Sequence, residues 1–247
     1  MAAVALLAQA KRKFCQSAMN VAIIVAAGAG QRMGGECPKQ FLNLCGEPVL
    51  IHTLRAFERC QSVDQIVVVL PQQHQAEAAK QLSAAGFNKI VSLIPGGPER
   101  QDSVWNGLQA IDATQTQIVV IHDGVRPLVT EQEITAVIAE ARATGAAVIG
   151  YPVTDTLKEV HSGRIIKTVD RRRFYLVQTP QAFRVSIILK AYQQALADGF
   201  RATDDASLVE RSEHVVTVVQ GSRQNIKITW PEDLALAEFW LNRRRGG

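Results

Sequence analysis

Short apolar runs rich in β-branched residues alternate with longer stretches of helical period along most of the chain. The apolar runs lie at residues 21–25, 65–70, 89–93, 117–121 and 146–151, and the helical stretches at 51–59, 73–85, 102–111 and 131–143. None of the apolar runs alternates with polar residues, which is typical of strands covered by helices on both faces. The pattern predicts an α/β fold with a doubly wound, mostly parallel, Rossmann-like sheet, whose ligands bind beyond the carboxyl ends of the strands.

The pattern changes between residues 154 and 179, where polar and β-branched residues alternate on both sides of a turn at residues 161–163. This predicts a β-hairpin that protrudes from the α/β body and contacts a partner subunit. Helices at 185–197 and 205–213, strands at 215–219 and 225–229, and a helix beginning at Pro231 are expected to follow. Without a repeat or a linker, we expect one domain over residues 19–247, with a protruding arm at about 154–179 and an N-terminal arm at 1–18.

The composition is that of a globular protein, with 47% hydrophobic residues. The longest apolar run, Met1 to Ala8, is far shorter than the ~20 residues of a membrane span, so no membrane association is expected. A basic triplet follows this run, which is the reverse of the order in a secretory signal. The four cysteines have neither zinc-ligand spacing nor histidine partners. We therefore predict free thiols and a cytoplasmic location.

The net charge of +4 does not indicate nucleic-acid binding. Nine of the 27 basic residues lie in three triplets, at 11–13, 171–173 and 243–245, and the remaining basic residues are outnumbered by the 23 acidic ones. Aromatic residues, at 6%, are too few to stack bases along a strand. A phosphate ligand, if bound, is therefore expected to contact a few individually placed cations rather than a basic groove.

The loop after the first predicted strand, residues 26–35, is rich in glycine and leads towards a helical turn. Such a loop brings backbone N–H groups close to an anion. A dinucleotide fingerprint needs glycine where Met33 stands, which disfavours an NAD(P)-dependent oxidoreductase, and the Lys-Ser/Thr pair of a Walker loop is missing. The segment is best interpreted as a nucleotide loop that carries its own cation, Arg32, with a second cation at Lys39 after Pro38.

Two further loops follow predicted strands at residues 95–104 and 121–127. Gly97 and Ser103 in the first are candidates for contacts with a base edge. In the second, Asp123 is placed to bind a ribose hydroxyl or the shell of a Mg²⁺ ion, and Arg126 to bind a phosphate. His122 is expected to pack in the core rather than to act as a base.

The C-terminal part of the chain holds weaker candidates. Asp204 and Asp205 are expected at a helix N-terminus, where their charge suits the helix dipole. Lys227 is the single cation of the strand predicted at 225–229.

In order, these segments read AAGAGQRM, ECPKQF, GGPERQDSV, HDGVRP, DTLK, TVDR, QTPQAF, TDDAS and NIKIT. From about residue 21 to 241 the chain resembles the cytidylyltransferases of sugar-alcohol phosphates, most closely those that act on 2-C-methyl-D-erythritol 4-phosphate in the non-mevalonate isoprenoid pathway. The resemblance implies an enzyme that uses CTP and this acceptor. It also implies a homodimer joined through the β-arm.

The resemblance assigns roles to individual residues. It implies a CTP site made of Ala26, Ala27, Gly28, Gly30, Gly97, Ser103 and Asp123. It implies an acceptor site made of Arg126, Thr156, Arg171, Thr179, Thr203 and Lys227. The residues implied in catalysis are Arg32, Lys39, Arg171 and Lys227. Thr156 and Arg171 are expected to serve the partner's site, and Mg²⁺ is expected to be held mainly by the CTP phosphates, with Asp123 as a candidate ligand.

Alternatives remain open at this point. Ribitol-5-phosphate cytidylyltransferases also carry valine before the arginine of the third loop, as this chain does in Gly124-Val125, so ribitol 5-phosphate is the nearest alternative acceptor. The chain lacks the Asp-x-Asp motif of many glycosyltransferases. A nucleotide sensor without catalysis would not need Arg32, Lys39 and Lys227 together.

Overall fold

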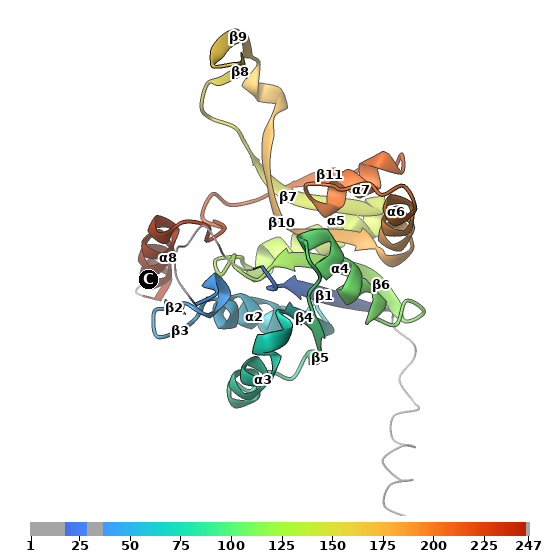
Figure 1. The fold of residues 1–247 in the computed structure, drawn as a ribbon, viewed down its shortest axis with the longest axis vertical. Coiled ribbons are helices and arrows are strands. Elements are labelled where there is room, and N and C mark those ends of the chain that lie inside the picture. Colours follow the sequence, from blue (N-terminus) through green and yellow to red (C-terminus); the bar gives the residue numbers. More distant parts are fainter. Residues whose placement is uncertain (1–17, 29–36, 246–247) are drawn as a thin grey trace, which may run out of the picture.

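The computed structural model describes residues 18–28 and 37–245, so most of the predicted N-terminal arm, together with Gly30 and Arg32, lies outside the described residues. The core is a seven-stranded sheet with the order β11-β7-β10-β6-β1-β4-β5 (Figure 1). Its strands are β1 (Met19–Val25), β4 (Gln65–Leu70), β5 (Ile90–Pro95), β6 (Thr116–Asp123), β7 (Ala146–Pro152), β10 (Tyr175–Arg184) and β11 (Thr217–Gln220). β10 is antiparallel to both neighbours and the other pairings are parallel, which confirms the predicted fold class.

Helices cover both faces of the sheet, as the uninterrupted apolar strands require. They are α2 (Val49–Arg59), α3 (Gln75–Ala84), α4 (Arg100–Gln109), α5 (Glu131–Thr144), α6 (Val185–Ala197) and α7 (Asp205–Arg211). A further helix, α8 (Pro231–Arg245), packs on a separate cluster that includes Leu44 and Leu128. Buried side chains of α2, α3 and α5 pack on one face, and those of α4, α6 and α7 on the other. Successive residues of β1 serve opposite faces: Ile24 belongs to the first cluster and Ile23 to the second.

The strand β10 was not predicted from the sequence. Pro180 lies within it and lacks the N–H that a strand donates to its neighbour, so the segment reads as a loop. In the structure the register of β10 on β7 shifts between Val177 and Gln181, and pairing with β6 begins only at Gln181. The proline therefore occupies an irregularity of the ladder, which is where a sheet tolerates it.

The predicted hairpin is confirmed as β8 (Leu157–His161) and β9 (Arg164–Val169), which project from the body at the end of a long arm (Figure 1). Ser162 and Gly163 form its turn, with φ of 47° and 76°. Large apolar side chains of the arm and its base are between 43% and 64% exposed, namely Val160, Ile165, Ile166, Phe174, Tyr175, Leu176 and Val177. This unpartnered apolar surface is unusual for a chain that acts alone.

The strand predicted at 225–229 is wrong, because these residues form an extended loop without a strand partner in the described sheet. The N–H of Ile228 donates instead to the carbonyl of Val125, at 2.9 Å, and the Ile228 side chain is buried beneath α8 together with Leu128. Together with the ion pair between Lys227 and Asp123 and the hydrogen bond from Arg126 to the Asn225 carbonyl, this contact fixes the loop against the end of β6. Within the described ranges, no helix combines the length and the apolar character that crossing a membrane requires.

Candidate active site

A cleft of about 560 Å³ opens at the carboxyl ends of β1, β5 and β6. The chain runs from β1 through β4 to β5 on one side and returns to β6 on the other side of β1. The cleft therefore lies at the point where the strand order reverses, which is the expected ligand site of a doubly wound sheet.

One wall of the cleft is built from small residues that let two loops approach closely. A Cβ atom on Gly96 would lie 2.1 Å from the Cβ of Ala27, and one on Gly97 would lie 2.4 Å from the Cβ of Asp102. The Ser103 hydroxyl accepts from the Gly97 N–H at 3.1 Å and donates to the Glu99 carbonyl at 3.0 Å. Glycine is thus required at both positions, and the serine holds the loop in shape.

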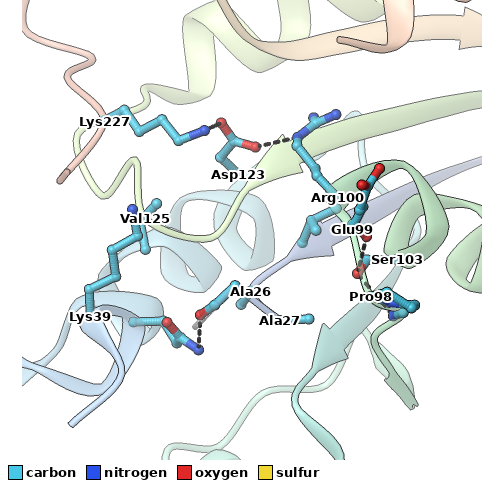
Figure 2. A pocket seen from close by; sticks show the side chains of 14 residues that line it. Ala26, Ala27, Lys39, Pro98, Glu99, Arg100, Ser103, Asp123, Val125 and Lys227 are labelled. Carbon is cyan, nitrogen blue, oxygen red and sulfur yellow. Dashed lines mark hydrogen bonds and ion pairs between the residues drawn. The ribbon is translucent and has the colours of Figure 1, made fainter. Parts of the chain in front are cut away.

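Asp123, at the end of β6, is buried and bound on both carboxylate oxygens (Figure 2). Its Oδ1 lies 2.9 Å from Nε of Arg100, and its Oδ2 lies 2.8 Å from Nζ of Lys227. Nε of Arg126 is 3.6 Å from the same Oδ2. The sequence predicted Asp123, Arg126 and Lys227 as site residues. The structure brings Lys227 next to Asp123 and Arg126, which lie about 100 residues earlier in the chain.

The charges around Asp123 determine its protonation. Burial would raise the pKa of this carboxyl, but the positive charges of Arg100, Lys227 and Arg126 outweigh burial and hold its pKa well below the ordinary value. Lys39 also lines the cleft and is 9% exposed. Asp205 is a second carboxylate bound to Arg100 and Glu99 also lines the cleft, so four described cations lie near three carboxylates. The surplus of positive charge suits an anionic ligand.

The residues directly behind Asp123 are structural. His122 is fully buried, with Nε2 3.3 Å from the Arg126 carbonyl and Nδ1 3.1 Å from the Thr179 hydroxyl. That hydroxyl also accepts from the Asp123 N–H at 3.0 Å. Thr179, implied as an acceptor contact, is thus 4% exposed and bound to the backbone beneath the cleft. The packed-core interpretation of His122 fits this environment.

His122 should make stability depend on pH. Burial lowers the pKa of its imidazole to about 3, whereas the unfolded chain has a histidine pKa of ~6.5. Between these values only the unfolded state binds the proton, so this contribution to stability is lost as the pH falls below about 6.5, with a limiting slope of about 1.4 kcal/mol per pH unit. Urea unfolding between pH 7 and pH 4.5 should therefore show a weaker pH dependence in His122→Gln than in the wild type.

The matched control is His161→Gln on the exposed arm, which should keep the pH dependence of the wild type. A difference in unfolding free energy between wild type and His122→Gln that stays constant with pH would contradict this assignment.

The family model of 2-C-methyl-D-erythritol 4-phosphate cytidylyltransferase matches residues 20–243. The chain belongs to this family. The protein of that name from Pelotomaculum thermopropionicum is 47% identical over 91% of this chain and 95% of its own length, and the one from Syntrophus aciditrophicus is 47% identical over 92% and 97%.

Solved structures agree with the family assignment. The crystal structure of 4-diphosphocytidyl-2C-methyl-D-erythritol synthase from Anaerococcus prevotii superposes with a TM-score of 0.81 at 32% identity, covering 91% of this chain and 96% of the other. The 2-C-methyl-D-erythritol 4-phosphate cytidylyltransferase from Thermus thermophilus gives 0.73 at 33% identity, with coverages of 89% and 98%. The resemblance stated from the motifs is confirmed. The protein is accordingly a nucleotidyltransferase rather than an oxidoreductase.

The Gly124-Val125 pair, which left ribitol 5-phosphate open, has a packing explanation in this member of the family. A Cβ atom on Gly124 would lie 2.8 Å from the Cβ of Ala26 and 3.1 Å from Cδ1 of Leu50. Val125 is 6% exposed and packs beside α8. The pair therefore fits the packing around the cleft, and the family match favours methylerythritol phosphate as the acceptor.

Several implied site residues do not gather in the cleft of a single chain. Ala26, Ala27 and Gly28 line it, but Thr156 and Arg171 are exposed on the arm, where Arg171 donates to the Thr154 carbonyl. Thr203 is exposed in the loop before α7. Gly30 and Arg32 lie outside the described residues. The roles of these residues stay predictions.

Gln40 and Arg100 are among the cleft residues that were not selected from the sequence. Gln40 is 1% exposed and donates to the Gly28 carbonyl at 3.3 Å, which fixes the end of the glycine-rich loop. Arg100 binds both Asp123 and Asp205. Arg100 stands inside the GGPERQDSV motif, so the motif located it, but its partners lie 23 and 105 residues away and no local spacing indicates them.

Proposed function

We propose that this cleft transfers CMP from CTP to 2-C-methyl-D-erythritol 4-phosphate, giving 4-diphosphocytidyl-2-C-methyl-D-erythritol and pyrophosphate for isoprenoid precursor synthesis. The observation that carries the proposal is Asp123 surrounded by Arg100, Arg126 and Lys227 beside a wall of small residues. The small wall leaves room for a nucleoside, and the cations match the phosphates of both substrates.

The nucleotide occupies the side of the cleft formed by the first two loops. Ala26, Ala27 and Gly28 lie against Gly97 and Ser103 there, and the backbone of these loops offers its polar groups to the cytosine. Gly30, which lies outside the described residues, belongs to the same proposed site. Asp123 lies where the ribose meets the phosphates.

The reaction needs charge stabilisation more than proton transfer. An acceptor phosphate oxygen attacks the α-phosphorus of CTP, the bond to the β-phosphate oxygen breaks, and pyrophosphate leaves. A phosphate monoester has its second pKa near ~6, so the attacking oxygen is already ionised and no general base is required. Arg32 and Lys39 stabilise the charge that develops on the transferring group, and Lys227, Arg126 and Arg171 orient the acceptor.

The donor groups of this cleft supply only part of the coordination shell that a Mg²⁺ ion needs. The described residues contain no group of three metal-binding side chains, and Asp123 is the one carboxylate at the end of β6. Mg²⁺ is commonly held by one or two carboxylates, substrate phosphates and water. We therefore assign most of its ligands to CTP and one to Asp123. When bound, the ion neutralises part of the phosphate charge.

The arm completes the site in a homodimer. Its exposed apolar side chains call for a covering surface, and Arg171 and Thr156 lie beyond the reach of the cleft wall of their own chain. A second copy that covers the arm would receive both residues in its acceptor site. Because each acceptor site would then combine residues of two chains, a monomer should lack a complete acceptor site.

A pyrophosphate-release assay tests the proposal directly. CTP with methylerythritol phosphate should give turnover, whereas UTP or ribitol 5-phosphate should give little, since each replaces one recognised partner. Turnover with ribitol 5-phosphate alone, or a preference for UTP, would contradict the assignment. Omission of Mg²⁺ in the presence of a chelator should abolish turnover.

A further inference from the structure

The first turn of α4 is tied to residues 200–205 by three consecutive side chains. The bridges run from Arg100 to Asp205 (2.8 Å), from Gln101 to the Phe200 carbonyl (3.1 Å) and the Ala202 N–H (3.0 Å), and from Asp102 to Arg201 (2.6 Å). α4 follows directly on the loop of Gly97, which forms part of the proposed nucleotide site. Segment 200–205 contains Thr203, a proposed acceptor contact. The bridges therefore join the two substrate sides of the cleft.

Arg100 differs from the other two bridging residues because it also reaches the cleft. Its Nε binds Oδ1 of Asp123 at 2.9 Å (Figure 2), while its Nη2 binds Oδ2 of Asp205 at 2.8 Å. Asp205 is 1% exposed and is fixed in turn by the Tyr192 hydroxyl, which donates to its Oδ1 at 2.6 Å. Tyr192 stacks on Trp105 of α4 itself, with ring centroids 6.0 Å apart. Asp205, Tyr192 and Trp105 thus connect the Arg100 guanidinium back to its own helix, which restricts its position.

We propose that Arg100 is a positioning residue, which with Asp205 sets the placement of the acceptor-side segment and of Asp123 relative to the nucleotide. The inference rests on the proposed function. The physical reason for such a role is the strict geometry of in-line attack, in which a displacement of about 1 Å can lower the rate by about 10²-fold. Arg100 contributes through Asp123 and segment 200–205, whereas Lys39 and Lys227 contribute through the phosphates.

Lysine cannot replace Arg100 in this role. The two contacts use different nitrogens of one planar group, and an ammonium on a flexible stem provides a single point of charge. Arg100→Lys therefore keeps the charge of the cleft and loses the bridge. Asp205→Asn is the complementary change, since the amide oxygen still accepts from Tyr192 but the amide nitrogen faces the guanidinium.

The experiment is a double-mutant cycle of Arg100→Lys and Asp205→Asn with kcat and KM measured for both substrates. We expect each variant to lower kcat by about 10- to 100-fold while KM for CTP changes by less than about three-fold. The double variant should resemble the single ones, because both remove the same bridge. Calorimetric titration with CTP should give near-wild-type affinity in all three, which provides a readout independent of turnover.

The control is Arg201→Lys, which weakens a bridge between the same two segments at the surface, where Arg201 is 53% exposed. Its kcat should stay within about two-fold of wild type, because surface ion pairs contribute little. If Asp205→Asn fails to fold, Tyr192→Phe loosens Asp205 from the other side and should lower kcat in the same direction.

Three results would overturn the role of Arg100: unchanged kcat in Arg100→Lys, a loss confined to KM for CTP, or additive effects in the cycle. The wild type, assayed alongside, separates this failure from that of the proposed function. An inactive wild type would contradict both, whereas an active wild type with wild-type-like variants would contradict the positioning role alone.

Discussion

Lys39→Ala should lower kcat by about 10²- to 10³-fold, the loss typical of removing one fixed group that stabilises transition-state charge. Lys39 begins the short 3₁₀ turn Lys39–Phe41, directly after Pro38, and its side chain lines the cleft while being 9% exposed. Because most of this side chain is buried, its charge should interact more strongly with a phosphate in the cleft than a fully exposed charge would. Steady-state and single-turnover assays of pyrophosphate release measure this effect.

The matched control is Lys80→Ala, which removes an exposed lysine of α3 far from the cleft and should leave kcat unchanged. Thermal unfolding should show that Lys39→Ala is folded. A variant that keeps the wild-type kcat would remove Lys39 from the mechanism, and one that changes only KM would make it a ground-state binding residue.

Much of the sheet could be predicted because its strands and helices have clear periodicity. The run at 65–70 matches β4 in full, and the helix predicted at 185–197 matches α6. β10 was not predicted because Pro180 argues locally against a central strand. The irregular register that accommodates the proline depends on the two neighbouring strands, which the local sequence does not show. The strand predicted at 225–229 had the right composition, but burial beneath α8 explains its apolar residues equally well.

The site was predictable to the extent that its residues follow strands directly. Asp123 is the last residue of β6, and the glycine-rich loop follows β1. The carboxyl ends of parallel strands meet at one edge of the sheet. Arg100 lacks such a signal, since both of its carboxylate partners come from distant segments. Arg171 illustrates a different limit: the arm holds it away from the cleft of its own chain, so its role in a partner's site stays a prediction.

Mixing Arg171→Ala with Lys39→Ala subunits should restore activity that neither variant has alone. If each site combines Lys39 of one chain with Arg171 of the other, a heterodimer contains one site with both changes and one with neither. It should therefore have about half the activity of a wild-type dimer. Differently tagged subunits, refolded together and purified through both tags, provide the heterodimer for the pyrophosphate-release assay.

The same design separates a shared site from a merely dimeric enzyme. If Arg171 served its own chain, each subunit of the heterodimer would carry one defect and activity would stay at the level of the parents. Arg164→Ala, an exposed change at the start of β9, is the control for perturbation of the arm and should leave activity near that of wild type. Recovery in the confirmed heterodimer requires that the arm reach the partner's cleft, because no intact site could otherwise arise from two damaged chains.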